Sequence, residues 1–252
     1  MKLLLIDIET APHKVVTWGL WNQTISPKHI LEMGFTLCWA AKWHKQKGVM
    51  FSSTYADGAE GMVHGAWDLL NEADAVIHYN GERFDVPTLN KEFIKIGLTP
   101  PRPYKQIDLL KVCRRQFKFP SGNKLDEVLR FLGMPQKLAH KGMDLWIECM
   151  NNDPKAWKHM ERYNRRDVTT MERLYKKLLP WISQHPNYAM YTDENRPVCT
   201  NCGGKKLTKQ GTAKTKTHLY RQYKCYDCGT WVRDVRNSTP RAKRDAMKVR
   251  VT

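Results

Sequence analysis

The sequence lacks long apolar runs, internal repeats and low-complexity segments other than a basic C-terminal tail. Its 252 residues have a mean hydropathy of −0.61. No apolar stretch approaches the roughly 18 residues that a membrane-spanning helix requires. The first apolar stretch, residues 3–6, stops at Asp7 and is too short for a secretion signal. We therefore expect a cytoplasmic protein with no membrane partner.

Acidic residues are also scarce. The chain has 25 Asp and Glu against 42 Lys and Arg, a formal net charge of +17. Residues 199–252 hold 14 of the basic residues and 3 of the acidic ones, so this segment alone carries +11. Such a basic segment predicts a polyanionic partner, and nucleic acid is the usual one. The alternative is a basic surface that serves only solubility.

Four of the seven cysteines form two Cys-x2-Cys pairs. Cys199 and Cys202 are separated by 22 residues from Cys225 and Cys228. In a cytoplasmic protein such cysteines are thiols or metal ligands rather than disulfides. Four thiolates at this spacing predict one structural Zn²⁺ in a closed tetrahedral site.

The surroundings of the cysteines agree with that prediction. Gly203 and Gly229 each follow the second cysteine of a pair, where a tight turn often needs a positive φ. The module resembles the zinc ribbons of nucleic-acid-processing proteins. Cys38, Cys113 and Cys149 lie in apolar settings, and we expect them to be core thiols.

The remainder of the chain predicts a mixed α/β fold. Three strands in a meander are followed by alternating helices and strands, which indicates a mixed sheet flanked by helices. Residues 12–34 have the composition of a loop. The expected strands are 3–6, 35–43, 49–55, 75–80 and 104–110, the expected helices are 60–73 and 86–97, and 108–183 is mainly helical. The expected division is a large domain 1–183, a linker 184–198, a small β-rich zinc ribbon 199–235 and a basic tail 236–252.

Five residues of the large domain are candidates for a catalytic metal site. Asp7 and Glu9 lie two apart on a strand and share one face. Asp85 stands at the start of a predicted helix, where a simple N-cap is the alternative. Tyr163 and Asp167 lie four apart on a helix, where an exposed pair is the alternative. Mg²⁺ and Mn²⁺ prefer such oxygen ligands, and two such ions suit phosphodiester cleavage.

The order and separation of these motifs resemble those of the DnaQ-like family, the DEDD 3′–5′ exonucleases of the ribonuclease H-like fold. The resemblance spans residues 1–180. The segment GNKLDEVLRFLGMPQK also resembles the helix that often lies between the second and third motifs. Because a related subgroup carries His where this chain has Arg162, the resemblance is to the Tyr subgroup, DEDDy.

The resemblance implies a role for each motif residue. Asp7, Glu9 and Asp167 would ligate one Mg²⁺ or Mn²⁺, Asp7 would bridge to a second ion, and Asp85 would hold that second ion. Tyr163 would orient the attacking water. Three further residues would support the site or contact the 3′-terminal nucleotide: Thr10, Asn80 and Phe84.

The resemblance implies a metal-dependent 3′–5′ exonuclease acting on single-stranded or frayed DNA, in a bacterial or phage-infected cell. Phage exonuclease-like proteins join such a domain to a zinc ribbon. Replication or repair proteins are implied partners, since the sequence contains no polymerase domain. DNA is favoured over RNA because the Tyr subgroup includes proofreading domains, although ribonuclease D-like enzymes share it. The alternatives are an RNA 3′–5′ exonuclease, a structure-specific nuclease and a non-catalytic nucleic-acid-binding adaptor.

Two further segments are candidates for nucleic-acid contact. In the ribbon, Lys205, Lys206, Arg221 and Lys224 are expected to meet phosphates, and neighbouring aromatic residues to stack on bases or form a small core. In the loop 12–34, Trp18 and Trp21 are expected either to stack beside a terminal base or to form a lid folded onto the core.

Overall fold

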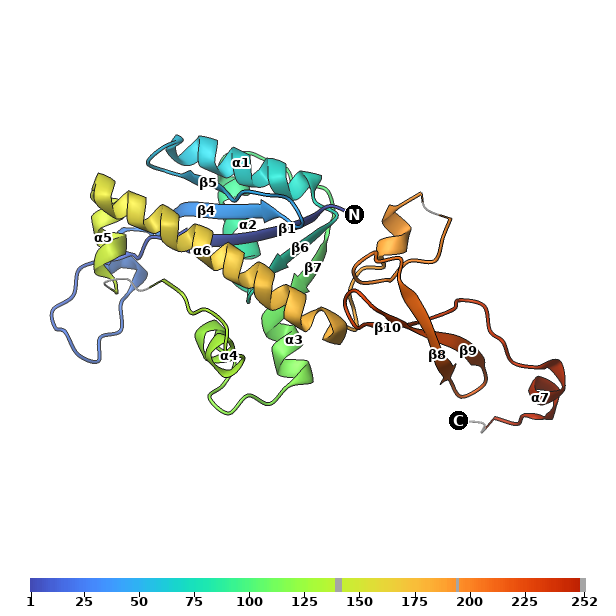
Figure 1. Ribbon diagram of the computed structural model, residues 1–252. Helices are drawn as coiled ribbons and strands as arrows, with labels where there is room; N and C mark the ends of the chain where they lie inside the picture. Colours follow the sequence, from blue (N-terminus) through green and yellow to red (C-terminus); the bar gives the residue numbers. More distant parts are fainter. Residues whose placement is uncertain (139–141, 194, 250–252) are drawn as a thin grey trace. The chain divides into compact units, whose positions relative to one another are not determined.

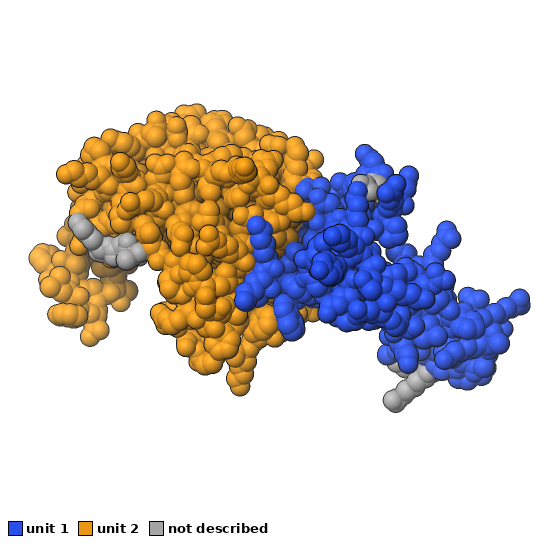
Figure 2. Space-filling view, viewed as in Figure 1, with its two compact units in different colours: residues 1, 176–252 blue, residues 2–175 orange. Residues whose placement is uncertain are grey.

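The structure is a computed structural model and describes residues 1–138, 142–193 and 195–249. The chain divides into two compact units, shown separately coloured in Figure 2. One unit comprises residues 2–175, and the other comprises residue 1 with residues 176–252. The finer division into domain, linker, ribbon and tail stays a prediction.

The larger unit contains a five-stranded mixed sheet in the order β5-β4-β1-β6-β7. Strands β1, β4 and β5 form the expected antiparallel meander, whereas β1, β6 and β7 run parallel (Figure 1). The carboxyl ends of the three parallel strands therefore meet at one edge. The strands are β1 (Leu3–Thr10), β4 (Thr36–Trp43), β5 (Met50–Ser53), β6 (Ala75–His78) and β7 (Lys105–Asp108), and a two-stranded ribbon of β2 (Lys14–Val15) and β3 (Ile30–Glu32) lies within the expected loop.

Helices cover both faces of this sheet. Alternation along β1 places Leu4, Ile6 and Ile8 against α1 and α2, where they share a buried apolar cluster with Met62 and Leu89. On the other face α6 crosses the sheet (Figure 1). The mixed α/β expectation is confirmed. The helices are α1 (Gly58–Glu72), α2 (Asp85–Lys95), α3 (Leu109–Gln116), α4 (Leu125–Phe131), α5 (Asp144–Met150) and α6 (Pro154–Leu178).

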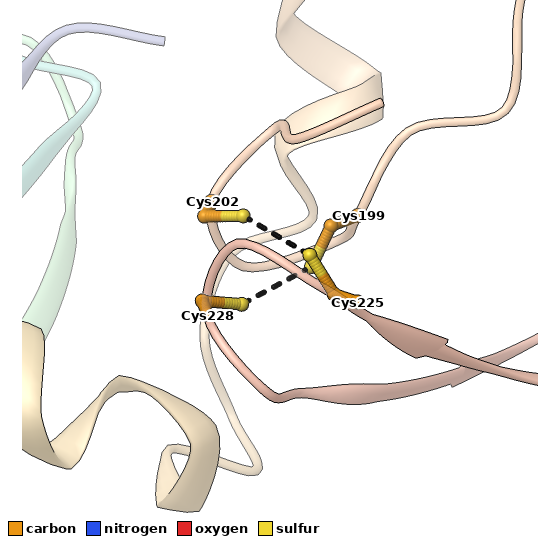
Figure 3. A group of neighbouring side chains, drawn as sticks. All are labelled: Cys199, Cys202, Cys225 and Cys228. Atoms are coloured by element: carbon orange, nitrogen blue, oxygen red, sulfur yellow. Dashed lines mark hydrogen bonds between the residues drawn. The ribbon is translucent and has the colours of Figure 1, made fainter. Parts of the chain in front are cut away.

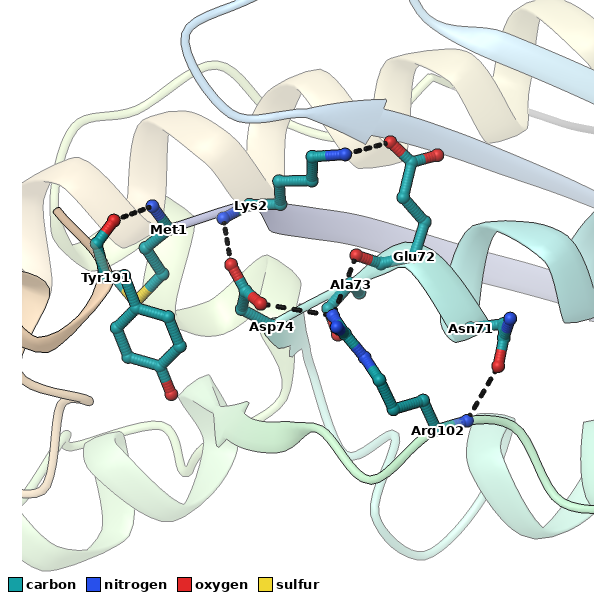
Figure 4. A network of polar contacts seen from close by, with 8 residues as sticks. All are labelled: Met1, Lys2, Asn71, Glu72, Ala73, Asp74, Arg102 and Tyr191. Atoms are coloured by element: carbon teal, nitrogen blue, oxygen red, sulfur yellow. Dashed lines mark hydrogen bonds and ion pairs between the residues drawn. The ribbon is translucent and has the colours of Figure 1, made fainter. Parts of the chain in front are cut away.

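A polar network anchors β1 at its amino end (Figure 4). The Lys2 backbone N–H donates to Asp74 Oδ2 at 2.7 Å, and the Lys2 ammonium lies 2.7 Å from Glu72 Oε1. Asp74 also receives the Arg102 guanidinium at 3.1 Å, while the Arg102 backbone N–H donates to Asn71 at 2.8 Å. These contacts tie β1, the end of α1 and the approach to β7 together at the edge opposite the strand carboxyl ends.

The smaller unit contains a three-stranded antiparallel sheet in the order β10-β9-β8. Buried Asn201 fastens the first cysteine pair to the chain after α6, because its side-chain amide donates to the carbonyls of Leu179 and Ile182 at 3.0 and 3.2 Å. The elements are η2 (Leu179–Trp181), η3 (Tyr188–Tyr191), β8 (Leu207–Lys214), β9 (Leu219–Cys225), β10 (Trp231–Arg233) and α7 (Arg241–Ala246).

Candidate carboxylate and cysteine sites

Three carboxylates converge at the carboxyl end of β1. Ligand oxygens of Asp7, Glu9 and Asp167 all lie within 4.8 Å of one another. Asp7 and Glu9 point to the α6 face because the intervening Ile8 points to the opposite core. Asp167 faces them from the middle of α6, so residues far apart in the sequence form one cluster.

Neighbouring side chains hold two of these carboxylates in place. Asn164, fully buried on α6, donates its side-chain amide to Asp7 Oδ2 at 2.7 Å. Trp146 of α5 donates its indole N–H to Glu9 Oε2 at 3.2 Å. Neither partner was among the residues inferred from the sequence, since an Asn or a Trp inside an amphipathic helix carries no distinctive signal.

Asp85 occupies the first position of α2 but does not cap it. Its Oδ1 accepts the Ile8 backbone N–H at 3.1 Å, which places the carboxylate beside β1, next to the residue that separates Asp7 from Glu9. The N-cap alternative is therefore wrong. Asp85 lies outside the three-carboxylate cluster, although its charge acts on Asp7.

Burial and mutual repulsion raise the pKa values of these carboxyl groups. For Asp7 the loss of hydration is the largest cause of the raised pKa, followed by the charges of Asp85, Glu9 and Asp167. Burial likewise raises the pKa of Glu9 to about 7 and that of Asp85 to about 7. One oxygen of Asp167, Oδ1, is buried and has no hydrogen-bond partner among the described residues. A cluster of hard oxygen donors with excess negative charge fits Mg²⁺ or Mn²⁺.

Lys137 is a site residue that the sequence did not reveal. Its ammonium lies 2.6 Å from Asp167 Oδ2, donates to the Tyr163 hydroxyl at 3.3 Å and sits 5.4 Å from the centre of the Tyr163 ring. Although burial opposes its charge, Asp167 and Asp7 raise the pKa of Lys137. The ammonium thus supplies a positive charge inside the carboxylate cluster. Lys137 lies in the irregular chain after α4, at the end of the segment GNKLDEVLRFLGMPQK. The resemblance of that segment gave Lys137 no role, so only the tertiary structure identifies it.

Tyr163 lies one turn before Asp167 on the same side of α6, as the spacing predicts. Its side chain is buried, and the pKa of the phenol is raised by burial first and then by the charge of Asp167. The hydroxyl therefore keeps its proton at neutral pH. It is a neutral hydrogen-bonding group at the edge of the carboxylates.

Hydrogen bonds to buried His78 and Asp108 fix the turn that leads to Asp85, and we call this pair of residues the lock. Asp108 accepts the backbone N–H of Asn80 at 2.9 Å, and Gly81 donates its N–H to His78 Nδ1 at 3.1 Å. That bond leaves the His78 proton on Nε2, which faces Gln106 Oε1 at 3.0 Å. Burial lowers the pKa of His78, so the ring is held neutral. The lock was not inferred from the sequence.

The residues expected to contact a terminal nucleotide lie near this edge. Thr10 ends β1 and is half-buried. Asn80 has a φ of 70°, a left-handed conformation that Asn tolerates better than most residues. Phe84 is 46% exposed, so its ring is available for stacking.

The loop after β1 does not fold onto the core. Trp18 is fully exposed, at 102% of its reference area, and Trp21 is 84% exposed. The lid alternative is therefore wrong for these two rings. The base of the loop is tight, because the Ala11 N–H donates to the Phe35 carbonyl at 2.8 Å and a Cβ on Gly34 would lie 2.3 Å from the Ala11 carbonyl oxygen.

Comparison with known proteins identifies the superfamily of this chain. Residues 6–179 match the RNase_H superfamily. The chain belongs to the RNase_H superfamily. The matched segment contains every one of the four carboxylates, and membership supports nuclease activity in general terms. A search of curated proteins found no match.

A solved structure is similar to this RNase_H superfamily chain. It is the family B DNA polymerase from the hyperthermophilic archaeon Pyrobaculum calidifontis, with a TM-score of 0.53 and 18% sequence identity. The match covers 71% of this chain and 24% of the polymerase chain, so it spans about a quarter of that larger protein. At this identity the likeness shows the fold alone. Among the described residues, no helix is both long and apolar enough to cross a membrane.

The superfamily match leaves the four-cysteine cluster outside it. The sulfurs of Cys199, Cys202, Cys225 and Cys228 all lie within 4.8 Å of one another (Figure 3). Cys199 and Cys228 are 3.6 Å apart, as are Cys202 and Cys225, too far for a disulfide. A tetrahedron with metal–sulfur bonds of about 2.3 Å has sulfur–sulfur edges of about 3.8 Å. The cluster therefore has the dimensions of a tetrahedral thiolate site.

The two cysteine turns have the same local geometry. Gly203 donates its N–H to the Cys199 carbonyl at 3.0 Å, and Gly229 donates to the Cys225 carbonyl at 2.9 Å. Both glycines have positive φ, 73° and 78°, as expected. The pKa of Cys199 is lowered to about 5, first through a hydrogen bond with the Cys202 thiol, whereas the same bond raises the pKa of Cys202. Within this pair Cys199 is therefore the thiol that ionises first.

The basic residues named from the sequence lie at the surface of this unit. Lys206 sits 5.7 Å from the centre of the Tyr226 ring, and Lys224 sits 5.6 Å from that of Trp231. Tyr226 is 79% exposed and Trp231 is 52% exposed, so neither ring forms a closed core. Lys205 and Arg221 are also exposed. The remaining cysteines, Cys38, Cys113 and Cys149, are buried thiols, as expected.

Proposed function

We propose that the protein is a metal-dependent 3′–5′ exonuclease of the DEDDy type that acts on single-stranded or frayed DNA. The observation that carries the proposal is the convergence of Asp7, Glu9 and Asp167 within 4.8 Å, with Asp85 bonded to the same strand and Tyr163 one turn before Asp167. Membership of the RNase_H superfamily and the structural likeness to a DNA polymerase support it.

Each side chain has a defined part in this proposal. Asp7, Glu9, Asp85 and Asp167 would hold two Mg²⁺ or Mn²⁺ ions. When bound, such ions stabilise charge on the phosphoryl oxygens and lower the pKa of a coordinated water. Tyr163 keeps its proton and orients a water by hydrogen bonding, while Asn164 and Trp146 fix the rotamers of Asp7 and Glu9.

A second part of the proposal concerns the four cysteines of the smaller unit. We assign them one structural Zn²⁺ in a zinc ribbon, because their sulfur spacing fits a tetrahedral site. Exposed Lys205, Lys206, Arg221 and Lys224 would contact phosphates, and exposed Tyr226 and Trp231 would stack on bases. The ribbon would thus add affinity rather than chemistry.

The test uses single strands labelled at the 3′ or the 5′ end, incubated with Mg²⁺ or Mn²⁺. We expect wild type to shorten the 5′-labelled strand stepwise from its 3′ end and Asp7→Ala to abolish this. Asp68→Ala, which removes an exposed carboxylate on α1, is the matched control and should behave as wild type. Absence of metal-dependent trimming by wild type would leave a non-catalytic adaptor, and internal cuts would indicate an endonuclease.

The preference for DNA needs a separate comparison. DNA and RNA oligomers of the same sequence are degraded in parallel under the same metal concentrations. We expect faster trimming of DNA. Faster trimming of RNA would move the assignment to an RNA 3′–5′ exonuclease without altering the carboxylate chemistry.

A further inference from the structure

A basic groove lies along α6 and is lined by residues to which the proposed function assigns no role. We call it the α6 groove; its volume is about 370 Å³, and its lining residues are Val49, Leu138, Arg162, Arg165, Arg166 and Thr169. The four α6 residues recur at intervals of three and four, so they share one face of the helix. Three guanidinium groups around one hollow form an anion-binding surface.

The three arginines differ in how firmly they are held. Arg165 donates its Nε–H to Glu161 at 2.8 Å, donates to the Val49 carbonyl and packs 5.9 Å from the centre of the Phe51 ring. The Arg165 guanidinium is therefore held in one orientation before any ligand binds. Arg166 is half-buried, and its Nε is a buried donor without a partner among the described residues. Such a donor is costly unless a ligand supplies an acceptor.

The groove also borders the carboxylate site. Arg166 immediately precedes Asp167, and Leu138 immediately follows Lys137, whose ammonium contacts Asp167. The same face of α6 continues with exposed Lys158 and Lys155, one and two turns before Arg162. Positive charge thus extends from the edge of the site along the helix, as expected for a path that follows a phosphate backbone.

We propose that the α6 groove binds a backbone phosphate of the nucleic-acid strand whose 3′ end lies at the carboxylates. The inference rests on the proposed exonuclease function, and it assigns Arg162 and Arg166 as the donors to that phosphate. Val49 and Leu138 give the hollow an apolar wall, which strengthens charge-assisted hydrogen bonds by excluding water. The groove recognises phosphate, so binding there is independent of base sequence.

The test compares full-length Arg162→Gln/Arg166→Gln with wild type. Affinity for a labelled single strand of about 20 nucleotides is measured in EDTA at several salt concentrations. Turnover is measured with Mn²⁺ on that strand and on the p-nitrophenyl ester of thymidine 5′-monophosphate, which has no neighbouring backbone phosphate. Lys95→Gln/Lys105→Gln is the control, because it removes two exposed charges from the far ends of α2 and β7. Arg165 is left intact because it also holds β5.

We expect strand affinity to fall about tenfold, with the slope of log affinity against log salt reduced by about 0.7 for each phosphate that the variant no longer neutralises. kcat/KM on the strand should fall more than kcat/KM on the ester. Arg166→Lys should weaken binding less than Arg166→Gln. Unchanged strand affinity, an equal decrease in the control, or an equal decrease on the ester would each overturn the proposal. If wild type hydrolyses neither substrate but the variants change strand affinity as expected, the result supports phosphate binding in the groove and contradicts the exonuclease function.

Discussion

Ionised Glu9 lowers the stability of the folded protein when no metal ion is bound. Burial raises the pKa of Glu9 from 4.5 to about 7 in the folded protein. The unfolded chain therefore releases its proton first, and the free energy of unfolding falls as pH rises between about 4.5 and about 7. The pKa values of Asp7 and Asp85 shift in the same direction. Cations close to these carboxylates should therefore stabilise the folded protein at neutral pH.

Glu9→Gln should therefore stabilise the metal-free protein. The amide can still accept the Trp146 N–H but cannot ionise. We expect a gain of roughly 1–3 kcal/mol in the free energy of unfolding at about pH 8 in EDTA, and almost none at about pH 4. Urea unfolding at both pH values measures it. A gain of equal size at both pH values would contradict the electrostatic explanation.

Divalent ions should stabilise wild type more strongly at about pH 8 than at about pH 5.5. The ions bind the deprotonated carboxylates, and protonation of Glu9 and Asp85 below their pKa values of about 7 competes with them. Melting temperatures with saturating Mn²⁺ and with EDTA at the two pH values measure the effect. Asp7→Asn should remove most of the Mn²⁺ shift. A shift that does not depend on pH would place the ions elsewhere.

Lys137→Met tests whether the Lys137 ammonium and divalent ions compete for the same carboxylates. Removing it leaves Asp167 without its ion pair, so the free energy of unfolding of the metal-free protein should fall by about 1–3 kcal/mol at neutral pH. Mn²⁺ affinity, measured by calorimetry, should rise several-fold because no resident cation must be displaced. Weaker Mn²⁺ binding in this variant would show instead that Lys137 helps to assemble the ligand set.

At the scale of elements, the turn between β6 and α2 decides where Asp85 lies. A Cβ on Gly81 would come 2.4 Å from His78 Cγ, and the His78 ring is fully buried with no room to move. Asp108 pins the same turn from the end of β7 through Asn80. Asp85 therefore takes its position from two neighbouring strand ends rather than from its own helix.

Gly81→Ala should destabilise the fold by about 2–3 kcal/mol and lower trimming activity, because relief of the clash displaces the turn before Asp85. Gly61→Ala is the matched control. Gly61 is exposed within α1 and has an ordinary helical φ, so Ala there should gain up to about 1 kcal/mol. Denaturant unfolding and the oligonucleotide assay together test the pair; equal effects at the two glycines would contradict the lock.

At the scale of the whole molecule, the charge is concentrated away from the carboxylates in sequence. Residues 199–252 carry +11 of the net +17. Truncation after Arg236 removes five basic residues and Asp245, a decrease of four net charges. We expect weaker oligonucleotide binding with a shallower salt dependence, while turnover of a mononucleotide ester is retained. Unchanged salt dependence would show that the tail does not contact nucleic acid.

The cysteine cluster gives a second prediction at this scale. Cys199→Ser/Cys202→Ser should abolish binding of about one zinc per chain, measured by elemental analysis. It should reduce oligonucleotide affinity more than it reduces turnover of the mononucleotide ester. Cys113→Ser, a buried thiol outside the cluster, is the control for zinc content. Unchanged nucleic-acid affinity would move the ribbon to contacts with protein.

The sequence by itself determined the elements and the ligand types. An apolar run ending on Asp7 and Glu9 predicts a buried strand, and local alternation is enough to place both carboxylates on one face. The pair alone leaves open whether they form a solvated rim or bind cations. Short spacings along the chain were likewise enough to predict that each Cys-x2-Cys pair shares a turn and that Tyr163 and Asp167 share a helix face. The mixed α/β class follows from the order of the elements.

Only the tertiary structure decided which distant groups meet. Lys137 enters the carboxylate cluster, His78 locks the turn before Asp85, and Arg166 places a buried Nε beside a groove. Local spacing gave none of these residues a role, because it does not specify the residues or ligands on which each of them acts. The tertiary structure also decided that Trp18 and Trp21 stay in solvent, since burial depends on whether a partner surface is present and not on hydrophobicity alone.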